Sequence, residues 1–273
     1  MINAHRSRHP VLLSCLVLCA SAASVQAAEP AVPAQEPAAA APVAQWTANA
    51  GVVSQYVSRG IRNSWGKPAV QGGVDYVHPS GWSAGTWAST VSDRFIEQGK
   101  VEWDLYGGYS GSTGDFGYSV MAYVYRYPGA VMSATDTKFD YSEVALGVTW
   151  RTASAKYYRT VSSMFFGIPD SRGTGYLDFT FNPELGNGWT LNLHAGDGRV
   201  AGNGNDIWDW RDAKAGVTKS LGGGWSASFA VTRAWGRTGI YKTYTTGVPD
   251  ASGRLHFADV AKATVIVGVN RTF

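Results

Sequence analysis

The sequence has few cysteines and few charged residues. Its only two cysteines, Cys15 and Cys19, lie in the first 27 residues, which we predict to be removed. The mature chain then has no disulfide and no thiolate metal site. Charged residues make up 16% of the chain, whereas a soluble domain carries about a quarter. A disulfide-bonded scaffold is thereby excluded, and an ordinary soluble domain is disfavoured.

The N-terminus has the pattern of an export signal. Arg6 and Arg8 precede an apolar run at residues 11–25, and no acidic residue lies before that run. The run is too short to span a bilayer as a helix. Small residues at the −3 and −1 positions predict cleavage after Ala27, which makes residues 1–27 a signal peptide.

After cleavage the chain is nearly neutral. The 23 basic residues include Arg6 and Arg8, so removing the signal peptide leaves one more base than the 20 acids. Nucleic-acid binding needs a concentrated basic surface, and we expect none. Residues 28–45 are rich in Ala and Pro, which predicts a disordered lead-in.

Glycine and aromatic residues, by contrast, are abundant. The chain has 33 Gly, 11 Trp and 14 Tyr, yet its mean hydropathy is only −0.13. This combination is typical of strands whose residues face lipid and water alternately. Residues 46–273 are therefore expected to form an outer-membrane β-barrel.

The last stretch, residues 262–273, carries this pattern most clearly. Val265, Val267 and Val269 fall on one face, and the polar residues fall mainly on the other. Such alternation predicts a strand with one apolar face. The chain ends on Phe273, which we interpret as the C-terminal assembly signal of a closing barrel strand.

Eleven further segments have strand character and are separated by turn residues. The connections alternate between short and long, as in outer-membrane barrels with tight periplasmic turns and longer outer loops. The fold class is thus all-β, an antiparallel up-and-down transmembrane barrel. We expect twelve strands, at residues 46–58, 69–78, 82–91, 100–109, 116–127, 139–150, 156–166, 176–181, 189–195, 207–219, 225–235 and 262–273.

A Gly-Trp pair begins three of these segments directly after a short turn. The tryptophans are Trp82, Trp189 and Trp225. Indole rings favour the membrane interface, where the ring is in an apolar environment and the N–H is hydrated. We expect these three residues to form an aromatic belt at the periplasmic interface.

The sequence resembles a known family in three places. These are V-S-Q-Y-V-S-R-G at 53–60, D-Y-V-H-P-S-G-W-S-A-G-T-W at 75–87, and Y-R-Y-P-G at 125–129 with Glu143 downstream. Together they are similar to the TorF-like family of proteobacterial porin-type proteins, over residues 46–273. The resemblance implies a β-barrel in the outer membrane and implies no catalytic residue.

Strand parity places eight charged side chains in the barrel interior. A base facing lipid at mid-depth would cost about 2–4 kcal/mol. The lining has two interpretations: a charged pore that sets ion preference, or a salt-bridged plug that closes the lumen. The predicted lining residues are Asp75, Glu102, Asp104, Glu143, Asp178, Asp212, Lys214 and Lys262.

No catalytic or metal-binding motif stands out. The histidines after the signal peptide are His78, His194 and His256, and spacing singles out no serine to partner them. The loop at 196–206 contains Gly, Asn and Asp but lacks the ligand spacing of a calcium loop. We expect no enzyme, no metal and no cofactor.

The sequence as a whole predicts a porin that allows passive diffusion of small hydrophilic solutes. The expected partners are outer-membrane lipid, the barrel-assembly machinery and those solutes; the oligomeric state is left open. The alternative is a closed barrel that acts through its outer loops. In that case residues 236–256, with Arg237, Tyr241, Lys242 and Tyr244, would form the contact loop.

Overall fold

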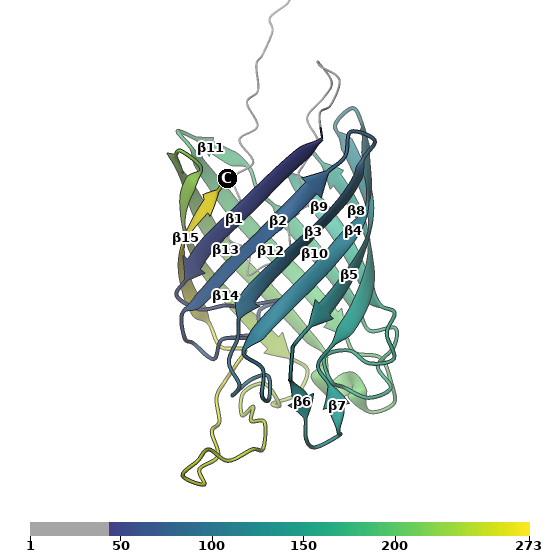
Figure 1. Cartoon of the computed structure of the whole chain (residues 1–273), viewed down its shortest axis with the longest axis vertical. Coiled ribbons are helices and arrows are strands. Elements are labelled where there is room, and N and C mark those ends of the chain that lie inside the picture. Colours follow the sequence, from purple (N-terminus) through teal and green to yellow (C-terminus); the bar gives the residue numbers. More distant parts are fainter. Residues whose placement is uncertain (1–43) are drawn as a thin grey trace, which may run out of the picture.

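Residues 44–273 of the computed structural model are described, and they form one closed antiparallel barrel (Figure 1). Strands adjacent in the chain are adjacent in the barrel, and β1 pairs with β15 to close it. The predicted twelve-stranded barrel is confirmed. Its strands are β1 (Gln45–Val53), β2 (Ala69–Val77), β3 (Trp82–Thr90), β4 (Val101–Thr113), β5 (Phe116–Arg126), β8 (Tyr141–Trp150), β9 (Ala153–Thr160), β10 (Gly175–Phe181), β12 (Trp189–Arg199), β13 (Trp210–Gly222), β14 (Trp225–Gly236) and β15 (Thr264–Thr272).

The predicted signal peptide, residues 1–27, and nearly all of the lead-in at 28–45 lie outside the described residues. Four small elements complete the described part. Strands β6 (Val131–Met132) and β7 (Thr137–Lys138) form a hairpin in one loop, and β11 (Glu184–Gly186) extends a turn. A 3₁₀ turn, η1, spans Asn205–Trp208.

The two ends of the barrel differ, as the alternation of connections predicts. Short turns and the C-terminus lie at one end, the turn end, and six long connections lie at the other, the loop end (Figure 1). Glycine makes three of the turns. Gly81, Gly188 and Gly224 have φ of 94°, 72° and 79°, a region that favours Gly, and the next residue is in each case the Trp that begins β3, β12 or β14.

Alternate residues of each strand face outward and inward. In β15, Val265 and Val267 are each 50% exposed, whereas Thr264 and Ile266 are buried. Period-two geometry fixes this division. Ile266, the one apolar residue on the otherwise polar face of this strand, therefore points into the barrel.

Three predicted strands extend at least three residues beyond the strands of the structure, and two others, at 100–109 and 189–195, end four residues before β4 and β12 do. The predicted strand at 46–58 ends at Val53, and the one at 156–166 is β9, which ends at Thr160. The one predicted at 207–219 begins at Trp210, after η1. The third overreach covers η1, which has no buried residue, whereas the first two cover apolar loop residues buried at the loop end, Tyr56, Val57 and Phe165. Their pattern imitates a strand because burial, and not sheet pairing, selects their side chains.

Candidate functional site: the constricted lumen

The connection between β1 and β2, residues 54–68, folds into the barrel; we call it the lumen loop. Tyr56 and Val57 in this loop are 0% and 3% exposed. The side-chain amide of Asn63 donates to Glu102 Oε2 on β4 at 3.2 Å. On the other side, a Cβ at Gly60 would lie 2.4 Å from the Cβ of Asp212 on β13.

β4 and β13 lie on opposite sides of the barrel, because six strand steps separate them in either direction. The lumen loop therefore reaches both walls and crosses the lumen. Backbone bonds fix it at two further points: the amide of Arg62 donates to Val260 O at 3.0 Å, and the amide of Ser92 donates to Asn63 O at 3.0 Å.

A buried ion pair joins this loop to the barrel wall. The guanidinium of Arg59 donates to both carboxylate oxygens of Glu143 on β8, at 3.1 Å and 2.6 Å. The two side chains are 8% and 0% exposed. Bidentate charge-assisted bonds of this kind are strong and directional. The pair positions Arg59, whose φ of 46° is unusual for a residue other than glycine.

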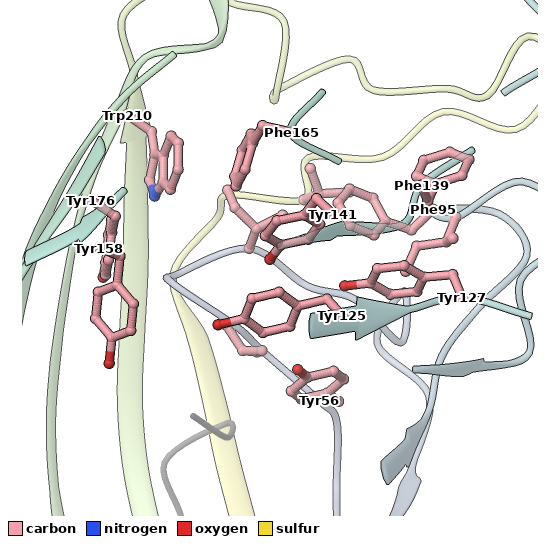
Figure 2. Close-up of a cluster of buried hydrophobic side chains, with 14 of the residues drawn as sticks. Tyr56, Phe95, Tyr125, Tyr127, Phe139, Tyr141, Tyr158, Phe165, Tyr176 and Trp210 are labelled. Carbon is pink, nitrogen blue, oxygen red and sulfur yellow. The ribbon is translucent and has the colours of Figure 1, made fainter. Parts of the chain in front are cut away.

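Aromatic side chains surround this pair. Successive ring contacts, with centroids 4.3–6.2 Å apart, run through seven residues and return to the first. The guanidinium of Arg59 lies 4.9 Å from the Tyr158 ring and 4.4 Å from the Tyr176 ring, within cation–π range. Part of the ring is visible in Figure 2. Its members are Tyr123, Tyr125, Tyr141, Phe165, Trp210, Tyr176 and Tyr158.

On the turn side of the lumen loop lies a polar cavity, the polar chamber. Asp178, His194, Asp212 and Lys214 line it together with Arg59. His194 lies between two carboxylates, with Nε2 2.7 Å from Asp212 Oδ1 and Nδ1 3.4 Å from Asp178 Oδ1. The hydroxyl of Tyr176 donates to Asp212 at 3.0 Å. The chamber thus has charged groups of both signs.

On the loop side lies a second cavity, the aromatic cup, which shares only Ser58 and Arg59 with the polar chamber. Ile61 and Asn63 also line it from the lumen loop. The other five long loops contribute mainly aromatic walls, and burial raises the pKa of Tyr127, Tyr241 and Tyr244 above the ordinary value. These hydroxyls therefore stay uncharged. The loop residues of the wall include Phe95, Tyr127, Phe165, Trp208, Tyr241 and Tyr244.

The structure brings most of the predicted lining residues to the interior. Glu102, Asp104, Glu143, Asp178 and Asp212 are buried there. Asp75 is half-buried and accepts a hydrogen bond from Tyr106, and Lys214 lines the polar chamber. Lys262 is exposed and precedes β15, outside the strand that was expected to include it. Whether these residues line a conducting pore stays a prediction.

Two residues of the expected contact loop face inward. Tyr241 is buried and donates to the backbone oxygen of Trp208 at 2.6 Å, and Tyr244 donates to that of Phe95 at 2.7 Å. Their rings line the aromatic cup. Loop packing buries Tyr241 and half-buries Tyr244, which leaves neither ring fully exposed; whether this loop binds a partner stays a prediction. Lys242 between them is exposed.

The aromatic ring and the role of Arg59 were not predicted from the sequence. The tyrosines lie at inward positions near the loop end of four strands, β5, β8, β9 and β10. That recurrence is the signal from which the ring could have been found. Within residues 44–273 no group of acidic, His or Cys residues is arranged to hold a metal ion, and none of the helical segments there has the length and apolarity to cross a membrane.

Comparison with known proteins gives the fold and the family. The chain matches a solved structure titled "KdgM porin" with a TM-score of 0.50 and 6% identity, over 83% of this chain and 99% of that one. It also matches "KdgM porin in complex with disordered oligogalacturonate" (TM-score 0.49, 7% identity, 85% and 99%) and OprD from Pseudomonas aeruginosa (0.37, 12%, 76% and 59%). Likeness at such identity establishes the barrel fold alone.

No curated protein matches the sequence. The TorF-like name suggested by the resemblance is not confirmed by any of these matches. The family model that does match covers residues 36–273 and is described as "Bacterial protein of unknown function (Gcw_chp)". The chain therefore belongs to the Gcw_chp family, which has no assigned function.

Proposed function

We propose that this protein is an outer-membrane channel whose lumen loop restricts passage. The observation that carries the proposal is the pair of cavities that meet at Ser58 and Arg59 inside a closed barrel. A solute moving along the barrel axis has to pass this point. Arg59 and its bond to Glu143 then form the narrowest part of the path.

The outward face supports a membrane location. Large apolar side chains are exposed on every side of the barrel, for example Val74, Leu105, Leu146, Phe229 and Val267. Contiguous exposed apolar surface of this extent is disfavoured in water and is what a lipid-facing band requires. Trp82, Trp189 and Trp225, at the turn end, are 61%, 42% and 45% exposed, in keeping with a belt at the periplasmic interface.

The inward charges favour small hydrophilic solutes with a preference for cations. Among inward strand positions of the described chain, two lysines, Lys156 and Lys214, face a larger set of acids, and the lumen loop adds Arg59. Rings of carboxylates favour cations in pores. The acids are Asp75, Glu102, Asp104, Glu143, Asp178 and Asp212.

The first test is single-channel conductance of the refolded barrel in a planar bilayer under a salt gradient. We expect small, steady steps and a reversal potential of the sign given by cation preference. Anion preference would contradict the assigned lining. Silence from correctly folded protein would overturn the channel and favour the alternative, a closed barrel that acts through its loops.

A further inference from the structure

The aromatic cup, at the loop end of the barrel, differs in chemistry from the polar chamber. The polar chamber contains Asp178, His194, Asp212 and Lys214, whereas the aromatic cup is lined mainly by aromatic and aliphatic side chains from all six long loops. Apolar cavities with a few polar groups at one end are typical of small-molecule sites. A mouth that serves only hydrated ions has no need of such walls.

The geometry points to a binding site for an uncharged aromatic small molecule in the aromatic cup. Its transport role rests on the proposed channel, but binding itself does not. The rings stand at different angles: Phe95 and Tyr244 are 4.9 Å apart at 49°, and Trp208 and Tyr241 are 5.7 Å apart at 73°. Such walls offer both faces and edges to a planar ligand, and offset or edge-on ring contacts are favourable.

Local charge selects against an anionic ligand. Arg59 is the only base that lines the cup in the described chain, and it bonds Glu143. Around the lumen loop and the neighbouring loops lie the buried carboxyl groups of Glu97, Glu102 and Asp104. None of the three lines the cup itself, but a carboxylate ligand would lie near them, and repulsion between like charges is costly where the dielectric is low.

The lining also argues against a sugar. A bound sugar directs many hydroxyl groups to its site, and each buried hydroxyl needs a partner. The polar side chains that line the cup from the lumen loop are Ser58, Arg59 and Asn63, and Asn63 already donates to Glu102. A ring with at most one polar group fits these walls better.

The test uses 5-fluoroindole and the full barrel in detergent micelles. Binding is followed by fluorine NMR line broadening, and a saturable component is separated from partition into micelles by titration. We expect saturable binding to wild type and at least a tenfold weaker affinity after Trp208→Ala. Trp235→Ala is the matched control, because Trp235 is 49% exposed on the outer face and should bind as wild type does.

Because Trp208→Ala removes a packed ring, a second variant fills the cup instead. Met132 lines it from β6, and Met132→Trp should abolish saturable binding while the barrel keeps its heat-modifiable gel mobility. Purely partition-like uptake by wild type, or equal affinity in all four proteins, would overturn the site. Fluorobenzoate or glucose binding better than fluoroindole would contradict the assigned ligand class. None of these results depends on conductance, so the binding site is tested independently of the proposed channel function.

Discussion

At the scale of single residues, the Arg59–Glu143 pair holds the lumen loop. Removing one partner of a buried ion pair leaves an uncompensated charge and costs about 3–5 kcal/mol. Glu143→Gln should therefore release the loop while the surrounding strand pairs remain. Limited trypsin digestion should then cut after Arg59 or Arg62, sites that are protected in wild type, as read by mass spectrometry.

An exposed ion pair provides the control for this release. Arg151 Nε lies 2.9 Å from Asp115 Oδ2 at the turn end, with side chains 65% and 59% exposed. Exposed pairs contribute about 0–1 kcal/mol, so Asp115→Asn should leave the digestion pattern unchanged. Equal protection of the loop in wild type and Glu143→Gln would refute the assigned role of the pair.

At the scale of elements, the seam between β1 and β15 closes the barrel. The amide of Phe273 donates to Ala48 O at 2.8 Å, and the Phe273 ring lies 4.7 Å from the Arg271 guanidinium. Phe273→Ala keeps the backbone bond and removes the ring alone. If the ring is an assembly signal, the amount of folded barrel in the outer membrane should fall several-fold.

Phe181→Ala is the matched change, since Phe181 is 45% exposed on the outer face at the turn end but lies away from the seam. Heat-modifiable mobility of the membrane fraction measures both variants. If both variants lose folded barrel to the same extent, Phe273 contributes only as a lipid-facing ring and is not an assembly signal.

The strands of the barrel could be predicted from the sequence, whereas the path of the lumen loop could not. Period-two alternation and the Gly-Trp turns suffice for twelve strands, their order and the inward side of Glu102 and Asp104, because these depend on neighbouring residues alone. The lumen loop could not be predicted in this way. Its position depends on contacts with β4 and β13, which are distant in sequence, and parity within one strand says nothing of such contacts.

The candidate site likewise has one set of residues that the sequence predicts and another that it does not. Asp178, Asp212 and Lys214 follow from strand parity. The meeting of Tyr158, Tyr176 and Arg59 depends on the register between strands and on a loop that leaves the sheet, so no single segment predicts it.

At the scale of the whole molecule, the barrel joins an aromatic mouth, a crossing loop and a polar chamber along one axis. Gly60 is where the crossing loop touches the far wall. Its φ is 77°, and an added Cβ would lie 2.4 Å from Asp212 Cβ and 2.8 Å from Ala234 Cβ. Both of these atoms are attached directly to strands and cannot rotate away, so any larger residue at 60 displaces the loop.

The most direct test of a loop-restricted channel is the single-channel conductance of Gly60→Ala against wild type. Gly129→Ala is the matched control, because Gly129 has a φ of 79° but nothing within 4 Å of an added Cβ. Both variants carry a similar left-handed backbone cost of about 1–2 kcal/mol. We expect a conductance at least twofold above wild type for Gly60→Ala and an unchanged one for Gly129→Ala. Equal conductance in all three folded proteins would show that the lumen loop does not restrict passage.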